Sequence, residues 1–271
     1  MNEHNRSIRR ASGLTGAIPN MVSARSIRHA TFRFYAELND LLPPARRFVA
    51  FTHEFELPAS VKDMIESMGV PHTEVNLILL NGTPVDFSRV VQDRDRISVY
   101  PAFNSPDVRP PHQLRPPLHE PRFVVDTHLG RLATYLRLLG FDALYNTKRD
   151  DRDLSQISAH ENRILLTRDC GLLKRGEVVH GSLIRTTEPK QQVIEVLRRF
   201  DLFSAVAPFR RCLRCNAVLN PVAKESILER LPPRTRENYE QFRTCPSCNR
   251  IYWNGSHYAH MQRLVQHVLA G

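Results

Sequence analysis

The sequence contains little that would place it in a membrane. No apolar run approaches the ~18 residues that a transmembrane helix needs, and no apolar segment follows the first charges as it would in a secretory signal. We therefore expect a cytoplasmic protein with no membrane partner. The hydrophobic content of 41% is still enough for packed cores, and 271 residues suffice for two or three domains.

Lysine is also scarce. Five of the 38 basic residues are lysines, so nearly all of the positive charge is carried by arginine. A guanidinium group is a better bidentate partner for phosphate than an ammonium group. The charge is uneven: residues 29–103 carry seven basic and ten acidic side chains, whereas residues 210–271 carry ten and four. The basic C-terminal part favours nucleic acid as a partner, although a solvated, soluble surface explains the same charge.

Prolines divide the chain. Six of the 19 prolines fall in residues 104–121, which predicts an extended linker. Residues 1–28 are rich in Ser, Arg, Asn and Gly, and we expect either a disordered basic tail or sequence upstream of a natural start at Met21. The other segments are three predicted domains, residues 29–103, 122–209 and 210–271.

Residues 29–103 combine strand patterns with one short helix. Alternating apolar side chains predict strands over residues 30–35, 48–55, 75–80 and 96–100, and Ser60 and Gly69 are a plausible N-cap and stop for the helix between them. This order resembles an α+β, ubiquitin-like β-grasp domain of the sulfur-carrier type. Such carriers need a free C-terminal Gly-Gly for adenylation, but here the chain continues past Pro101. We therefore expect a binding or scaffolding module with a protein partner.

Strand and helix patterns alternate through residues 122–209. Short apolar runs predict buried strands over residues 122–126, 141–145 and 164–167, and within 178–186. The first helix follows at once, with Gly140 as its stop and an apolar face made by Leu129, Leu132, Ala133, Leu136 and Leu139. Two more helices are expected over residues 151–161 and 188–200. The predicted fold class is α/β, a parallel sheet with right-handed crossovers.

Acidic side chains follow these predicted strands. Asp126 ends the first strand, Asp169 lies just past the third, and Asp150 and Asp151 begin the second helix. The carboxyl ends of parallel strands meet at one edge of a sheet, where ligands bind. Several carboxylates together suit Mg²⁺ or Mn²⁺, which can activate water for hydrolysis. Alternatively, Asp150 and Asp151 cap their helix, and Asp126 and Asp169 are solvated loop acids.

Other side chains near this edge also have two interpretations. Arg168 either contacts phosphate or pairs with a neighbouring Asp. Thr167 either hydrogen-bonds a metal ligand or merely ends its strand. Asp142 and Asp153 are lesser candidates for the metal. Cys170 is expected to be a small, partly buried residue rather than a reactive thiol.

The remaining cysteines form two C-x2-C pairs, Cys212 with Cys215 and Cys245 with Cys248. Each pair can direct two thiolates at one ion, and four thiolates form the tetrahedral shell typical of structural Zn²⁺. Disulfides are the weaker alternative in a cytoplasmic chain. A shell closed by four thiolates has no open position, so we do not expect catalysis at this metal.

Several motifs combine in one order: Asp126 to Ala133, Leu136 to Asp142, Arg163 to Asp169, the two cysteine pairs, and Ile251 to His257. Together they resemble the Mut-seven C-terminal RNase family. That family looks like a PIN-type nuclease domain fused to a zinc ribbon, and its bacterial two-domain form has a ubiquitin-like β-grasp domain in front. The resemblance covers about residues 29–271.

The resemblance implies a PIN-like three-layer α/β domain, an appended zinc ribbon and metal-dependent RNA cleavage. It implies Asp126, Asp151 and Asp169 as the catalytic acids. The basic ribbon would hold the RNA, and the candidate nucleic-acid-binding residues are Arg131, Arg168, Arg214, Arg250 and His257. The alternative is a non-catalytic RNA- or protein-binding adaptor with a degenerate PIN fold.

Three residues of the last motif have alternatives of their own. Tyr252 and Trp253 either stack on bases or pack beside the cysteines as core residues. His257 either approaches the nuclease edge or phosphate, or is a helix-start residue that packs on the ribbon.

Overall fold

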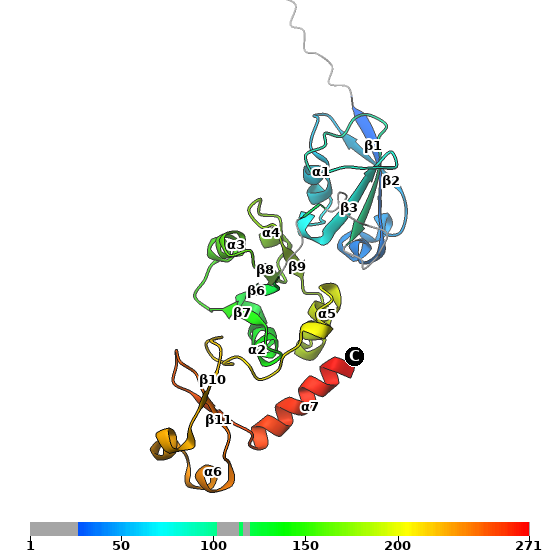
Figure 1. Ribbon diagram of the computed structural model, residues 1–271. Helices are drawn as coiled ribbons and strands as arrows, with labels where there is room; N and C mark the ends of the chain where they lie inside the picture. Colours follow the sequence, from blue (N-terminus) through cyan, green and yellow to red (C-terminus); the bar gives the residue numbers. More distant parts are fainter. Residues whose placement is uncertain (1–26, 102–113, 116–119, 271) are drawn as a thin grey trace, which may run out of the picture.

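The computed structural model describes residues 27–101, 114–115 and 120–270 (Figure 1). The predicted tail, residues 1–28, and the predicted linker, residues 104–121, lie mostly outside these residues. Within them, no helix has the length and apolar character needed to cross a membrane. The described chain forms an N-terminal domain (residues 28–101), a central domain (residues 122–209), and a ribbon (residues 210–255) that continues into a long last helix.

The N-terminal domain is a mixed sheet with one α-helix. Its strands lie in the order β2-β1-β5-β3-β4, in which β1 and β5 are parallel and the other pairs antiparallel. Helix α1 packs on this sheet through Val61, Met64 and Ile65. The elements are β1 (Arg28–Phe34), η1 (Ala36–Leu41), η2 (Pro44–Arg46), β2 (Phe51–Phe55), α1 (Val61–Ser67), η3 (His72–Glu74), β3 (Val75–Leu80), β4 (Thr83–Pro84) and β5 (Arg96–Pro101).

Local chemistry sets the ends of α1 as predicted. The Ser60 hydroxyl accepts a hydrogen bond from the Asp63 N–H at 3.1 Å, and Gly69 follows the helix with φ +104°. The strand predicted from Phe48 is wrong in its first residues, because β2 begins only at Phe51. Phe48 has φ +59° and donates its N–H to Asn39 Oδ1, so it belongs to a turn rather than to the ladder.

The central domain is a four-stranded parallel sheet in the order β7-β6-β8-β9. Side chains alternate across it: Phe123 and Val125 pack with α2 and α5, and Val124 packs with α3 and α4 on the other face. The result is the expected three-layer arrangement. Its elements are β6 (Arg122–Val125), η4 (Thr127–Leu129), α2 (Gly130–Leu138), β7 (Asp142–Tyr145), α3 (Asp151–His160), β8 (Ile164–Thr167), α4 (Cys170–Leu173), β9 (Gly181–Leu183), α5 (Pro189–Arg199) and η5 (Phe203–Ala205).

The ribbon is a small antiparallel sheet in the order β10-β11-β12. The last helix, α7, leaves the ribbon and returns to the central domain, where Val265 and Val268 join the core beneath α2 and α5 (Figure 1). The elements are β10 (Asn220–Val222), η6 (Lys224–Arg230), α6 (Pro233–Asn238), β11 (Phe242–Thr244), β12 (Ile251–Trp253) and α7 (Ser256–Ala270).

Both edge strands of the central sheet contact a neighbouring domain. At β9, the Leu183 N–H donates to Glu74 Oε1 of the N-terminal domain at 2.8 Å. At β7, the Ala143 N–H donates to Asn216 Oδ1 of the ribbon at 3.1 Å. Each acceptor takes the place that a further strand would occupy. The flanking domains are therefore docked at the two opposite edge strands of one sheet.

Candidate functional site

The carboxyl edge of the central sheet carries Asp126, directly after β6. Its side chain is buried, and Oδ2 accepts a hydrogen bond from the Thr167 hydroxyl at 2.6 Å. Its other oxygen accepts from the Thr127 hydroxyl at 3.1 Å. Thr167 is the last residue of β8, the neighbouring strand. The carboxylate is thus oriented at the edge by two hydroxyl groups.

Asp169 lies at the same edge, two residues beyond Thr167. Its N–H donates to the Thr167 hydroxyl at 3.0 Å, and its Oδ1 accepts from the Gly171 N–H at 2.6 Å. The second bond makes Asp169 the N-cap of the one-turn helix α4. Thr167 therefore links the carboxylate of Asp126 to the backbone of Asp169, which is the hydrogen-bonding role considered for it from sequence.

Asp150 and Asp151 lie at the start of α3, and both are exposed. Asp150 Oδ1 accepts from the Asp153 N–H at 2.8 Å, so it is the N-cap of this helix. Asp151 and Asp153 are in the first turn, where the helix dipole stabilises a negative charge. The capping role anticipated for this acidic pair is present at Asp150.

The four acids do not form a tight cluster in this structure. Across residues 27–101, 114–115 and 120–270, one group of three or more Cys, His, Asp or Glu side chains has its ligand atoms all within 4.8 Å of one another, and it consists of the four ribbon cysteines. Asp126, Asp150, Asp151 and Asp169 are not gathered to that distance. Their assignment as ligands of Mg²⁺ or Mn²⁺ stays a prediction.

Asp142 lies at the opposite, amino edge of the sheet, where it joins the ribbon to the central domain. Its carboxylate pairs with Arg163 at 2.7 Å and accepts from Asn216 Nδ2 at 2.8 Å. Burial raises the pKa of Asp142, but the hydrogen bonds from Arg163 and Asn216 outweigh burial and lower the pKa below its ordinary value. This residue is therefore committed to a structural network, remote along the strands from Asp126 and Asp169.

The five candidate nucleic-acid-binding residues divide between two places. Arg131, in the first turn of α2, and Arg168, between Thr167 and Asp169, are exposed near the carboxyl edge. Arg214, Arg250 and His257 are exposed on the ribbon or just beyond it. The ribbon contacts the sheet through Asn216 at the amino end of β7, so these three residues do not share the edge of the acids.

The four ribbon cysteines converge as predicted. The sulfur atoms of Cys212 and Cys248 are 3.5 Å apart, and those of Cys215 and Cys245 are 3.3 Å apart. None of them forms a disulfide. Each pair lies in the same kind of turn, in which the residue after the second cysteine (Asn216 or Asn249) has positive φ and donates its N–H to the first cysteine's carbonyl. Four thiolates at this spacing fit one tetrahedral metal ion such as zinc.

The two aromatic residues of the last motif pack in different places, and only Tyr252 lies beside this cluster. The Tyr252 hydroxyl lies 3.1 Å from Cys212 Sγ and accepts a hydrogen bond from the Leu213 N–H. Burial raises the pKa of the Cys212 thiol, but the hydrogen bonds from Tyr252 and from the backbone outweigh it and lower the pKa to about 6. Trp253 packs against Ile227 and Phe242. Packing beside the cysteines therefore describes Tyr252, whereas Trp253 packs in a separate cluster of the ribbon, and both side chains remain partly exposed.

The contacts between domains involve residues that sequence reasoning missed. Glu74 is fully buried and pairs with Arg185 at 2.9 Å and Arg199 at 3.2 Å. His72 Nε2 lies 2.8 Å from the Val178 carbonyl oxygen. No local pattern marks these residues, because each partner lies more than a hundred positions away. The one available signal is a charged residue, Glu74, directly before the apolar strand β3.

Two family models match the chain. One, described as the Mut7-C RNAse domain, matches residues 121–265. The other, described as Mut7-C ubiquitin, matches residues 27–107. No curated protein and no solved structure gives a match. The first model spans the central domain and the ribbon, and the second spans the N-terminal domain.

Proposed function

Because the chain belongs to the Mut7-C RNAse family, we propose that it is a ribonuclease that hydrolyses phosphodiester bonds of RNA with the help of Mg²⁺ or Mn²⁺. The observation that supports this most is that Thr167 links the Asp126 carboxylate to the backbone of Asp169 at the carboxyl edge of a parallel sheet. That edge is where ligands bind in such folds. Carboxylates at one edge supply the oxygen ligands that hard divalent cations prefer.

In this proposal Asp126, Asp151 and Asp169, with Asp150 beside them, hold the cation. When bound, such a cation lowers the pKa of its water and offsets negative charge on the leaving oxygen. The Thr167 hydroxyl fixes the orientation of Asp126, and the N-cap bond to Gly171 fixes that of Asp169. Arg131 and Arg168, exposed near the same edge, contact phosphate groups of the RNA at that edge.

The ribbon has a structural part in this function. Cys212, Cys215, Cys245 and Cys248 hold one Zn²⁺, which fixes the ribbon and the base of α7 against the central domain. A closed shell of four thiolates takes no part in hydrolysis. Metal analysis of the purified chain is expected to find one zinc per molecule, and Cys245→Ser is expected to abolish it. Retention of zinc by that variant would contradict the assignment.

A second candidate is a non-catalytic adaptor for RNA or protein. It is favoured by the spread of the acids, since Asp150 is used as a helix cap and the four carboxylates do not meet within coordination distance. In this case the N-terminal domain, matched by the ubiquitin family model, recruits a protein partner and the central domain is a platform.

Cleavage of a single-stranded oligoribonucleotide with Mn²⁺ separates the two candidates. The wild-type chain is compared with Asp126→Asn and Asp169→Asn, and with Asp201→Asn as a control. Asp201 is an exposed acid of the same domain with φ +52°, a conformation that Asn tolerates well. We expect losses on the order of a hundredfold or more for the first two variants and none for the control. Equal activity in all four proteins would refute the nuclease function.

A further inference from the structure

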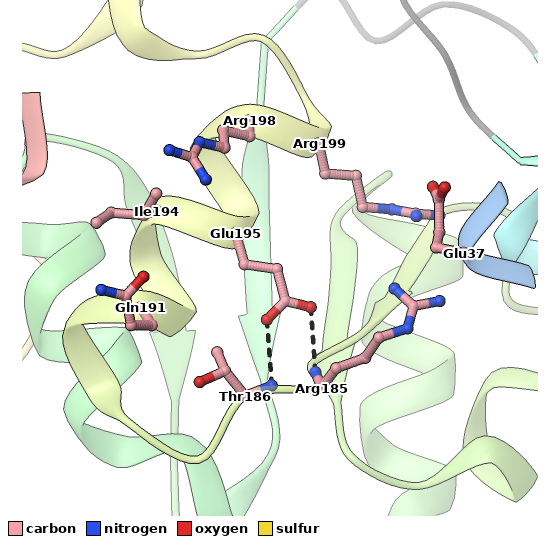
Figure 2. Close-up of a pocket in the computed structure, with 8 residues that line it drawn as sticks. All are labelled: Glu37, Arg185, Thr186, Gln191, Ile194, Glu195, Arg198 and Arg199. Carbon is pink, nitrogen blue, oxygen red and sulfur yellow. Dashed lines mark hydrogen bonds between the residues drawn. The ribbon is translucent and has the colours of Figure 1, made fainter. Parts of the chain in front are cut away.

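A cavity of about 530 Å³ lies where the N-terminal domain meets the central domain (Figure 2). On one side is Glu37 of η1, and on the other are Arg185 and Thr186, which follow β9. The remainder comes from α5, whose lining residues are Gln191, Ile194, Glu195, Arg198 and Arg199. Since β9 is parallel to β6 and β8, Arg185 leaves the sheet at the same edge as Asp126 and Asp169.

Arginine side chains slightly outnumber acidic ones around this cavity. Three of the eight lining residues are arginines, and Arg115 lies directly behind them, bonded to the carbonyl oxygens of Thr73 and Val75. Burial, and to a lesser extent the charge of Arg199, lower the pKa of Arg115 to about 10. Glu74, behind the cavity, binds both Arg185 and Arg199 through one oxygen.

The guanidinium groups keep hydrogen-bonding capacity. Among the described residues, the Nε atoms of Arg185 and Arg199 are buried without a hydrogen-bond partner. The Arg199 side chain is 10% exposed, so this donor is withdrawn from bulk water as well. A buried donor without a partner is costly. Both arginines also line the cavity, and an anion bound there would supply an acceptor for such donors.

The acid in the cavity wall already has backbone partners. Glu195 accepts hydrogen bonds from the N–H groups of Arg185 and Thr186, at 3.1 and 3.4 Å, as Figure 2 shows. These bonds tie the loop after β9 to α5 and so fix the position of the Arg185 backbone. Glu37, on the N-terminal domain, is the other acid that lines the cavity.

We propose that this cavity binds a phosphate group of the RNA strand whose neighbouring phosphate lies at the Asp126–Asp169 edge. Planar guanidinium groups are well suited to bidentate binding of phosphate, and the volume is within the range of ligand sites, which often form at domain boundaries. The inference rests on the proposed function for the identity of the strand. What it adds is the location at which the phosphate binds, namely Arg185, Arg198 and Arg199 rather than the ribbon.

The proposal gives the N-terminal domain a direct part in binding RNA. Glu74 is a positioning residue, because it holds Arg185 and Arg199 at the cavity without facing it. Glu37 contributes negative charge to the wall and weakens the attraction for an anion. Two domains therefore build the site together. Its arginines attract an anion, whereas Glu37 repels it.

Fluorescence anisotropy of a labelled single-stranded oligoribonucleotide tests this on the full chain without added divalent ions, so that binding is measured apart from cleavage. Arg198→Ala is expected to raise Kd about tenfold and to reduce the salt slope by about 0.7. Lys190→Ala is the matched control, because it removes a positive charge from the exposed surface of α5 outside the cavity. We expect it to change Kd less than twofold.

Glu37→Gln provides a test of opposite sign, with an expected decrease in Kd of about two- to threefold. A merely structural role of Glu37 would not strengthen binding. Thermal melts of all variants verify folding. Equal weakening by Arg198→Ala and Lys190→Ala would overturn the cavity assignment in favour of general attraction, as would weaker binding by Glu37→Gln.

Competition with inorganic phosphate and with a mononucleotide identifies the source of the anion. We expect the oligonucleotide to bind more tightly than either, and equal affinity for the mononucleotide would overturn the assignment to a strand. The two proposals can also fail separately. Selective weakening by Arg198→Ala in a chain that does not cleave RNA supports the cavity and refutes the nuclease. Cleavage with no selective effect of Arg198→Ala does the reverse.

Discussion

Thr167 is the single residue on which the geometry of the acidic edge depends most. Its hydroxyl donates to Asp126 and accepts from the backbone of Asp169, so both directions of one O–H group are used. Thr167 itself is fully buried, and water cannot replace either bond. The orientation of Asp126 and the path of the chain into α4 are therefore coupled through one oxygen atom.

Replacing Thr167 by Val keeps the shape of the side chain and removes that oxygen. We expect Thr167→Val to lower the free energy of unfolding by about 1–3 kcal/mol, because a buried carboxylate oxygen and a partly buried N–H lose their partner. Thr167→Ser keeps the hydroxyl and should lose much less. Urea denaturation measures the stability, and RNA cleavage with Mn²⁺ measures the site. Equal stability of the two variants would show that the hydroxyl is not required.

His180, just before β9, couples stability to pH. Burial and then the charge of Arg115 lower its pKa to about 4. The unfolded chain protonates this histidine near pH 6.5, whereas the folded chain does so only near pH 4. The contribution of His180 to folding stability is therefore complete above pH 6.5 and is lost as the pH falls toward 4. Between pH 7 and pH 5 the free energy of unfolding decreases by up to about 2 kcal/mol through this group. In His180→Gln, urea denaturation at the two pH values should show a smaller decrease than in the wild type. An unchanged decrease would contradict the assignment.

At the scale of elements, the sequence predicted strands and helices well where a run of apolar residues was followed by a charged residue or a glycine. The predicted strands of the central domain agree with β6, β7 and β8 to within one residue at either end. Gly140 ends the first helix with φ +97°, as expected from its place after the apolar face. Helix α4 was not predicted, since its single turn of four residues is too short to show a helical period.

Gly140 also shows why that stop is needed. A methyl group there would collide with the Ala207 carbonyl oxygen, in addition to the strain of positive φ. We expect Gly140→Ala to destabilise the chain by more than ~1 kcal/mol in thermal or urea denaturation. Gly176→Ala is the control, because nothing lies within 4 Å of the position that its added methyl group would take. A similar loss of stability in both variants would contradict this explanation, because Gly176→Ala meets no atom and should not destabilise the chain.

At the scale of the whole molecule, the sequence predicted the order of the domains but not how they dock. The spacing of apolar residues predicts individual strands and helices, and the spacing of the cysteines predicts one metal site. The pairs Glu74–Arg185 and Glu74–Arg199 join segments that no local rule relates. For the same reason no sequence pattern indicated which end of the strands the ribbon contacts. Asn216 and Asp142 hold it at their amino ends.

Glu74 tests the docking of the N-terminal domain. In Glu74→Ala, Arg185, Arg199 and the Leu183 N–H lose a fully buried partner. We expect a loss of about 3–5 kcal/mol of stability, as for other broken buried ion pairs, and faster amide exchange in β9. Glu54→Ala, on the exposed surface of β2, is the control. Slow exchange in β9 of the Glu74 variant would mean that the two domains dock without this contact.

The two side-chain acceptors at Leu183 and Ala143 have a consequence for how the protein can be divided. The central sheet depends on other domains to complete its hydrogen bonding at both β7 and β9. Residues 122–209 taken alone would present two rows of backbone groups open to strand addition by other chains. Such a fragment is expected to self-associate instead of remaining a small monomer. Its neighbours thus act as built-in protection against aggregation.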